Sequence, residues 1–386
     1  MKKRQLLRKA AAVALTGIMM ATCLTGCGGG SGSDSSDSSE KAGGETAGTD
    51  EDADGNGYAD KLYLYNWSEY MTQEVKDGFQ DKYGIEIVET TYESNEEMFA
   101  KLTAGEATDY DIIVPTNFFV KALIESDLLE PFDEGAITTF DNYDQSFLDQ
   151  EYDPGNKYTI PYLGTASMVV GNKKMLDELG VTINDWSDLA DPKLKDNLVV
   201  MDDNSGYTSL AYSCMGLDPA NKTVEGLDDA QEYLVDKISP NVKAWCSNAA
   251  GRDMLVKNEA AVGYVYSGLA AQILAENPDT QLYLMDKKNS LSMDVWAMVK
   301  GCKHKKEAEL FINYVTSPEI AAKLVEYSMY VCPNTAAKEY VSDDLKNNEA
   351  CFLPDVFFEN YYMMNEIKSD IATKNDEVAT IVKSSK

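Results

Sequence analysis

Strand-like and helix-like segments alternate three times in the first well-patterned part of the chain. Three runs read as strands because they are rich in apolar, β-branched and aromatic residues: residues 62–65 (LYLY), 85–92 (IEIVETTY) and 111–114 (DIIV). Apolar residues at helical spacing follow each run, such as Val75 and Phe79, and Ser94 supplies a helix start. This order requires parallel strands with helices on both faces. The sequence therefore predicts an α/β fold built on a mostly parallel sheet.

Polar and aromatic side chains follow the first and third of these strands. Trp67, Ser68 and Tyr70 come after the first strand, and Thr116 and Phe118 come after the third. Ligands of open α/β sheets bind beyond the carboxyl ends of the strands. We therefore expect these two turns to lie at a ligand site, although Trp67 and Tyr70 are also suited simply to cap a core.

The first 57 residues lack this alternation. A basic head, an apolar stretch over residues 10–24 and the motif L-T-G-C ending at Cys27 are typical of a bacterial lipoprotein signal peptide. We expect removal of residues 1–26, lipid modification of Cys27 and a flexible Gly/Ser/Asp-rich tether over residues 27–57. This places the protein on the extracytoplasmic face of the cell membrane as a lipid-anchored protein. An ordinary signal peptide with an incidental cysteine is the alternative.

The size and charge of the remaining body, residues 58–386, limit its organisation and partners. A body of this length exceeds what one hydrophobic core usually organises, which predicts two lobes. The net charge of −31 argues against nucleic acid or an anionic membrane surface as a partner. That charge is compatible with a cationic ligand but does not demonstrate one.

The sequence lacks the usual catalytic and metal-binding motifs. Its single histidine, His304, stands in the run K-H-K-K, which we interpret as a solvated basic patch; neither G-x-S-x-G nor H-E-x-x-H occurs. We therefore expect no enzyme, no metal and no cofactor. Five cysteines in the body are scattered without C-x-x-C spacing, which predicts free thiols and leaves one disulfide open: Cys214, Cys246, Cys302, Cys332 and Cys351.

Several motifs occur in order along nearly the whole body. Two are W-S-D-L-A-D-P (residues 186–192) and E-A-E-L-F-I-N-Y-V-T-S-P-E (residues 307–319). Others are Y-N-W-S-E-Y (65–70), T-Y-E-S-N-E (91–96), Y-D-I-I-V-P (110–115), I-P-Y (160–162) and M-D (293–294). The first two resemble extracytoplasmic solute-binding proteins of bacterial ABC importers in general. The others resemble the spermidine/putrescine-binding branch of that family.

This resemblance implies a fold and a mode of action. The fold would be the two-lobed periplasmic-binding-protein fold, of type II, with the ligand in the cleft between the lobes. Residues 58–164 plus 293–338 would form lobe 1, and residues 165–292 plus 339–386 would form lobe 2. The protein would act as a monomer that captures a polyamine without changing it and delivers it to an ABC permease.

The resemblance also implies a set of ligand contacts. Asp203 and Asp294 would each receive an ammonium group, and Trp67 would stack along the methylenes. The remaining implied contacts are Ser68, Tyr70, Thr116, Phe118, Ser247, Tyr266, Tyr330 and Asn365. The chemistry is consistent, because an ammonium in a water-poor cleft needs a carboxylate. Aromatic faces suit both methylenes and cations, at about 0.5–2 kcal/mol for each cation–π contact.

Three positions depart from the polyamine-binding pattern. Gly206 stands where the family often has a second carboxylate, Ser292 replaces a tryptophan and Phe118 replaces a tyrosine. These departures favour putrescine over spermidine. Asp202 could replace the missing charge, although neighbouring strand residues normally point to opposite faces.

Two other functions remain open from the sequence. One is a binding protein for another solute such as ferric iron, for which the adjacent pair Tyr361–Tyr362 is a candidate, although a chance pair on an amphipathic helix is the simpler interpretation. The other is a purely structural surface lipoprotein, which would not close around any small solute.

Overall fold

The computed structural model describes residues 55–105, 109–285, 288–365 and 367–385. These residues belong to one contact unit, Asp50–Lys386. The predicted signal peptide, the predicted lipidation site Cys27 and most of the predicted tether lie outside the described residues. No helix within the described ranges is both long and apolar enough to cross a membrane.

Parallel strands and their helices form a first group of elements, which we call lobe 1. Its elements, in chain order, are β1 (Lys61–Trp67), α1 (Gln73–Tyr83), β2 (Glu86–Tyr92), α2 (Asn95–Thr103), β3 (Ile112–Ile113), α3 (Asn117–Glu125) and the short β4 (Leu129–Glu130). Strand β1 pairs in parallel with both β2 and β3. The side chain of Ser94 caps α2 by accepting a hydrogen bond from the Glu97 amide, as the sequence predicts.

A second group of elements, lobe 2, repeats this arrangement. Its elements are α4 (Lys173–Leu179), β6 (Leu198–Met201), α5 (Asn204–Cys214), α6 (Val224–Tyr233), β7 (Val242–Cys246), α7 (Asn248–Val256), β8 (Val262–Tyr266), α8 (Ser267–Glu276) and β9 (Thr280–Tyr283). Strand β6 pairs in parallel with both β7 and β8.

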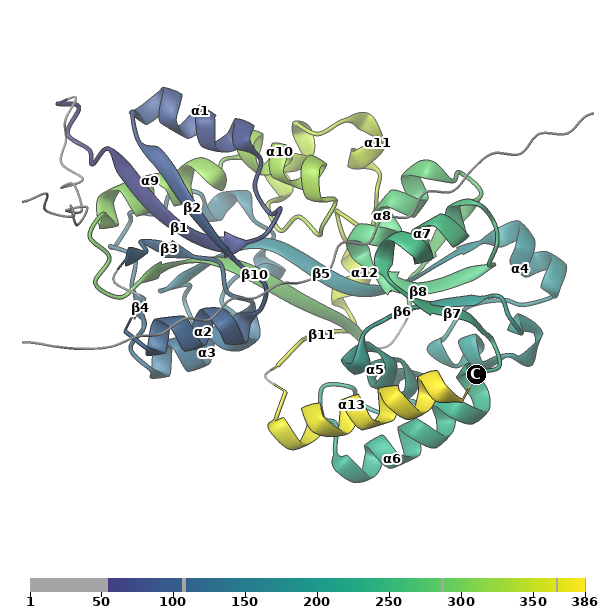
Figure 1. Ribbon diagram of the computed structural model, residues 1–386. Coiled ribbons are helices and arrows are strands. Elements are labelled where there is room, and N and C mark those ends of the chain that lie inside the picture. Colours follow the sequence, from purple (N-terminus) through teal and green to yellow (C-terminus); the bar gives the residue numbers. More distant parts are fainter. Residues whose placement is uncertain (1–54, 106–108, 286–287, 366, 386) are drawn as a thin grey trace, which may run out of the picture. The chain divides into compact units, whose positions relative to one another are not determined.

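Two long strands join the lobes. Strand β5 (Thr159–Asn172) and strand β10 (Asn289–Val299) pair with each other in antiparallel orientation. Strand β10 also pairs with β3 of lobe 1, and β5 also pairs with β8 of lobe 2. The sheet order is therefore β2-β1-β3-β10-β5-β8-β6-β7 (Figure 1). Along this order the sheet is parallel over β2-β1-β3 and β8-β6-β7 and antiparallel at the crossing strands, with which β4 and β9 also pair in antiparallel orientation. Both crossing strands continue through the residue boundaries expected for the lobes, which stay a prediction.

The last third of the chain returns to both lobes. Its elements are α9 (Lys305–Val315), α10 (Pro318–Ser328), α11 (Asp343–Lys346), α12 (Asp355–Phe358), β11 (Tyr361–Met363) and α13 (Ser369–Ser384). Pro318 starts α10 because a proline lacks the amide hydrogen needed to continue α9. The pair Tyr361–Tyr362 lies on strand β11, so its assignment to a helix is wrong. Helix α13 packs on α5 and α6 of lobe 2 (Figure 1).

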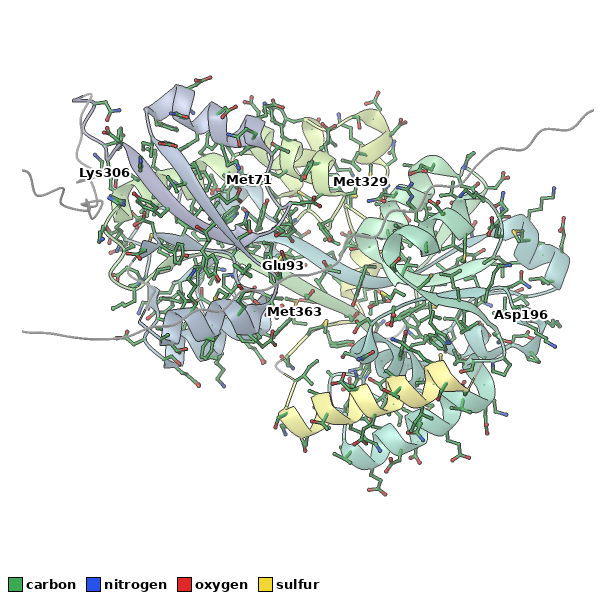
Figure 2. All side chains as sticks on the ribbon, in the orientation of Figure 1. Met71, Glu93, Asp196, Lys306, Met329 and Met363 are labelled. Atoms are coloured by element: carbon green, nitrogen blue, oxygen red, sulfur yellow. The ribbon has the colours of Figure 1, made fainter. Side chains whose placement is uncertain are left out.

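Apolar clusters on both faces of the sheet hold these layers together. In lobe 1, Val75 of α1 and Phe311 of α9 pack on one face, and Met98 of α2 and Val120 of α3 pack on the other. Figure 2 shows side chains filling the space between the sheet and the helices. The expected α/β architecture with helices on both faces is confirmed, but the sheet is mixed rather than mostly parallel, because the two crossing strands pair in antiparallel orientation with each other and with β3 and β8. The five cysteines of the described body form no disulfide.

His304 is a buried anchor, so its assignment to a solvated basic patch is wrong. The residue is 9% exposed, and its Nδ1 lies 2.9 Å from Oδ2 of Asp111. The Asp111 carboxylate also accepts hydrogen bonds from the backbone amides of Tyr63 and His304. The local run of lysines gave no sign of this partner, because Asp111 lies 193 residues earlier in the chain.

We predict that Asp111→Ala lowers the free energy of unfolding by about 3 kcal/mol, because several buried groups lose one carboxylate acceptor. Urea denaturation followed by circular dichroism measures this change. The matched control is Asp109→Ala, which removes an exposed carboxylate two residues away. Equal stability of the two variants would contradict the anchoring role of Asp111.

Candidate ligand-binding site

A cavity of about 400 Å³ lies where the two lobes and the crossing strands meet. Its lining comes from the end of β1, from the starts of α2 and α3, from β5 and β10, and from the end of β8. The lining residues are Trp67, Ser68, Tyr70, Asn95, Thr116, Phe118, Thr165, Ser167, Tyr266, Ser290, Ser292, Asp294, Tyr330 and Met364. The structure thus brings eight of the predicted contacts together in one cavity, including both strand-end turns.

Asp294 is the carboxylate of this cavity. The pairing of β10 with β5 is irregular beside Asp294: Asp294 pairs with Leu163 and Val295 with Pro161, so Tyr162 of β5 is an extra, unpaired residue, as in a β-bulge. The Asp294 carboxylate accepts a hydrogen bond from the Thr116 hydroxyl at Oδ1 and one from the Tyr70 hydroxyl at Oδ2, both at 2.6 Å. Two donors from different turns therefore fix this carboxylate in place.

Burial of the Asp294 carboxyl raises its pKa to about 6, and the hydrogen bonds from Thr116 and Tyr70 offset part of that increase. At neutral pH the group is therefore mostly an anion that has lost much of its hydration. An anion in this state gains more from a bound cation than an exposed carboxylate does. The Asp294 site is accordingly suited to a cation.

Aromatic rings surround Asp294. The centroid of the Tyr70 ring lies 5.1 Å from that of the Tyr162 ring and 5.8 Å from that of the Tyr330 ring, and both pairs are edge-on. The indole nitrogen of Trp67 donates to the Val114 carbonyl at 2.9 Å. This hydrogen bond orients the Trp67 ring at the cavity wall, so its position is fixed before any ligand arrives.

Asp203 lies on the lobe 2 side and joins the cavity through Tyr266. It caps α5 by accepting the Ser205 amide at Oδ1, while its Oδ2 accepts the Tyr266 hydroxyl. Its neighbour Asp202 instead pairs with Lys383 of α13 and accepts the Tyr207 hydroxyl. Asp202 therefore does not replace the carboxylate that is missing at Gly206.

The remaining predicted contacts differ in whether they line this cavity. Ser68 is exposed at its rim and donates to Glu93, and Phe118 lines both this cavity and a neighbouring one. Asn365 lines two neighbouring cavities. Ser247 is exposed at the start of α7 and does not line the cavity. A role for Ser247 would require a different arrangement of the lobes.

Polar residues of the crossing strands also line the cavity, although they were not among the predicted contacts. Thr165 and Ser167 alternate on β5, and Ser290 and Ser292 alternate on β10 in step with Asp294. Alternate residues of a strand share one face. The spacing S-x-S-x-D was therefore a readable signal for a polar strand face. Asn95, which donates to the Thr116 hydroxyl at 2.9 Å, left no comparable signal.

The two residues of the pair Tyr361–Tyr362 share one cavity but have different surroundings. The Tyr361 hydroxyl donates to the Ser146 carbonyl, and Tyr362 also lines a second cavity. Burial raises the pKa of Tyr361 and raises that of Tyr362 to about 12, which disfavours the tyrosinate form that binds iron. Within the described ranges, histidine, cysteine and acidic side chains form no cluster of three or more that could hold a metal ion.

Two lobes joined by crossing strands, with a cation-suited cavity between them, define the class of solute-binding proteins. Residues 74–353 match the family described as bacterial extracellular solute-binding protein. The chain belongs to this family. Its members bind and transport solutes, and the expectation that the chain is not an enzyme is confirmed.

Individual relatives show which solute-binding proteins the chain is similar to. The chain is 30% identical over 295 residues to the spermidine/putrescine-binding periplasmic protein of Salmonella typhimurium, covering 76% of this chain and 83% of that protein. It is 32% identical over 304 residues to the putrescine/cadaverine-binding protein of Pseudomonas aeruginosa, covering 76% and 85%. Among solved structures it resembles the spermidine/putrescine ABC transporter substrate-binding protein PotD from Streptococcus pneumoniae, with a TM-score of 0.73, 28% identity and coverage of 84% and 99%.

We predict that Tyr70→Phe raises the pKa of Asp294 above its value of about 6 by about one pH unit, because the carboxylate loses one of its two donors. Carboxyl carbon NMR of aspartate-labelled protein measures this pKa. Tyr330→Phe is the control, since it removes a hydroxyl from the same cavity without removing a hydrogen bond to Asp294. A pKa that moves equally in both variants would rule out the specific effect of Tyr70.

Proposed function

We propose that this protein is the substrate-binding component of an ABC importer and captures a polyamine outside the cell membrane for delivery to a permease. The observation that carries the proposal is Asp294, a desolvated carboxylate held by Tyr70 and Thr116 inside an aromatic-walled cavity. Relatives named for spermidine, putrescine and cadaverine binding support the same ligand class.

In this proposal the ligand bridges the two lobes. One ammonium binds Asp294 beneath Trp67 and Tyr70, and the second reaches the Asp203–Tyr266 pair of lobe 2. Each lobe gains a contact only when the cleft is closed, so the ligand favours the closed form that docks on the permease. Ser68, Thr116, Phe118, Tyr330 and Asn365 complete the proposed contacts, and Ser247 would join them on closure.

We further propose that putrescine is preferred over spermidine. A diamine needs two carboxylates, which Asp294 and Asp203 supply. A third is missing at Gly206, where an added Cβ would lie 3.0 Å from Oδ2 of Asp203. Asp202 is held by Lys383. A third ammonium would therefore be desolvated without a matching charge, which is unfavourable.

The remaining parts of the proposal concern location and assembly. Lipid attachment at Cys27 would anchor a monomer to the extracytoplasmic face of the membrane through the tether of residues 27–57. Residues 58–164 plus 293–338 would move as one lobe against residues 165–292 plus 339–386 during closure.

Calorimetric titration of the body with putrescine and spermidine tests the function. We expect the wild type to bind putrescine at least tenfold more tightly than spermidine. Asp294→Asn should weaken putrescine binding by at least tenfold, about 1.4 kcal/mol, because the ammonium loses its charged partner.

Asp202→Asn is the matched control, because it removes a carboxylate that pairs with Lys383 rather than facing the cavity. Unchanged affinity in Asp294→Asn would remove Asp294 from the site. Spermidine binding as tightly as putrescine would reject the diamine preference and leave the polyamine assignment intact. No binding of either amine would reject both.

The raised pKa of Asp294 predicts a pH dependence of amine binding. With a pKa of about 6, roughly nine in ten Asp294 carboxyls are ionised at pH 7 and one in ten at pH 5. Only the ionised form attracts an ammonium, so the Kd for putrescine should rise about tenfold over this range. Titrations at pH 7, 6 and 5 measure this rise. Asp294→Asn should bind weakly and independently of pH, and a flat wild-type profile would contradict the assignment.

A further inference from the structure

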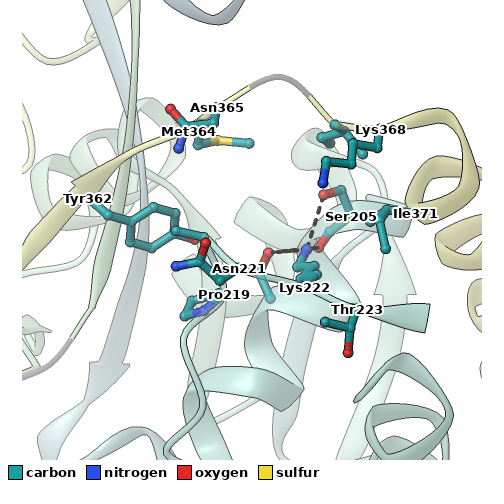
Figure 3. A pocket seen from close by; sticks show the side chains of 13 residues that line it. Ser205, Pro219, Asn221, Lys222, Thr223, Tyr362, Met364, Asn365, Lys368 and Ile371 are labelled. Atoms are coloured by element: carbon teal, nitrogen blue, oxygen red, sulfur yellow. Dashed lines mark hydrogen bonds between the residues drawn. The ribbon is translucent and has the colours of Figure 1, made fainter. Parts of the chain in front are cut away.

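A second cavity, of about 430 Å³, lies between the start of α5, the loop before α6 and the segment that leads into α13 (Figure 3). Its lining combines hydroxyl, amide and lysine side chains with a few apolar ones. The residues are Ser205, Ser209, Pro219, Ala220, Asn221, Lys222, Thr223, Tyr362, Met364, Asn365, Ile367, Lys368 and Ile371. In a chain with 65 acidic and 34 basic residues, this lining contains two lysines and no described carboxylate.

Lys222 places a buried positive charge beside this cavity. Its ammonium lies within hydrogen-bond distance of four neutral oxygens of α5: the Ser205 carbonyl and the Thr208 hydroxyl at 3.0 Å, the Ser209 hydroxyl at 2.8 Å and the Ser205 hydroxyl at 3.4 Å. Burial lowers the pKa of Lys222 to about 8, and the charge of Asp203 offsets part of that effect. The ammonium is thus charged at neutral pH and poorly hydrated, and hydrogen bonds satisfy it without an ion pair.

This situation differs from that of two other partly covered lysines in the described residues. Lys76 contacts Glu89 at 2.8 Å, and Lys374 contacts Asp228 at 2.7 Å. Those two lysines have their charge balanced by a direct carboxylate contact. Lys222 forms no such direct contact with any described residue, and Asp203 acts on its charge only through space.

Lys368 adds a second positive charge to the same cavity. Figure 3 shows its amino group pointing into the cavity toward Ser205, which also contacts Lys222. Lys368 is exposed and forms no ion pair with a described residue. Two ammonium groups that face one space repel each other, and an anion between them would turn this repulsion into attraction.

Neutral donors around the lysines would complete an anion site. The side-chain amides of Asn221 and Asn365 and the hydroxyls of Ser209 and Tyr362 all belong to the lining. These groups donate hydrogen bonds to oxyanions. The overall negative charge is a weak objection, because exposed charges are screened beyond about 8 Å at physiological ionic strength.

We propose that the Lys222–Lys368 cavity binds a small oxyanion, either a carboxylate or a phosphate group. Met364 lines both this cavity and the Asp294 cavity, so the two sites are neighbours. The site would give the cleft a positive end in lobe 2, opposite its negative end at Asp294. The proposal does not depend on the identity of the amine.

Titration calorimetry with inorganic phosphate and with succinate, in Tris–chloride buffer at pH 7, tests this site, because the buffer contains no competing oxyanion. We expect saturable binding of at least one of the two at one site per chain. Lys222→Met and Lys368→Met should each raise its Kd at least tenfold. Lys243→Met is the matched control, since Lys243 is an exposed lysine of lobe 2 outside the cavity, and its Kd should stay within twofold of the wild type.

Each result of these titrations either supports or overturns the proposed oxyanion site. Phosphate binding alone or succinate binding alone identifies the oxyanion, and either supports the site. A Kd weaker than about 10 mM for both in the wild type overturns the proposal, as does binding that both cavity variants retain. If Lys222→Met unfolds in a thermal melt, Lys368→Met decides, because Lys368 is exposed and its loss removes no ion pair. Putrescine titration in parallel shows whether the amine assignment fails or holds independently.

Discussion

The antiparallel pairing of β5 with β10 is the constraint on which the rest of the structure depends. These two strands carry the sheet from lobe 1 into lobe 2 and also form the floor of the cavity between them. Their ladder of backbone hydrogen bonds connects the lobes and shifts its register at one place. The one irregularity in this pairing is the extra residue Tyr162 of β5 beside Asp294, so the shift in register and the carboxylate of the cavity lie next to each other.

The electrostatics of the cleft follow from this placement. Asp294 would be an ordinary carboxylate on an exposed strand, but at the floor of the cavity it loses hydration and its pKa rises. Tyr70 and Thr116 prevent the rise from going further, because they hydrogen-bond the ionised form. The balance leaves an anion at neutral pH that is not fully satisfied, which is the condition for strong attraction of a cation without chemistry.

The charged groups on the lobe 2 side of the cavity also have partners. Asp203 is already engaged by the Ser205 amide and the Tyr266 hydroxyl, and the ammonium of Lys222, from the loop before α6, contacts the Ser205 carbonyl. Its attraction for a second cation is therefore weaker than that of Asp294. The two sides of the cavity therefore differ in the partners of their charged groups.

The sequence by itself determined the local features of this protein. Strand–helix alternation predicted the α/β sheet, the residues after β1 and β3 indicated two turns of the site, and Ser94 marked a helix start. These features depend on neighbours a few residues apart, whose chemistry can be read directly. Sequence patterns also led to two errors, because K-H-K-K around His304 and the pair Tyr361–Tyr362 each resemble a common local motif.

Only the tertiary structure decided which distant residues meet. The burial of His304 depends on Asp111, the pKa of Asp294 depends on Tyr70 and Thr116, and the engagement of Asp202 depends on Lys383 of the last helix. The second cavity is likewise lined by both Lys222 and Lys368, which lie far apart in the sequence. An aspartate or a lysine has the same one-letter code in the sequence whether its side chain is exposed, ion-paired or desolvated. Its charge state and its use depend on solvent exclusion and on partners that folding brings together, and no local pattern encodes either.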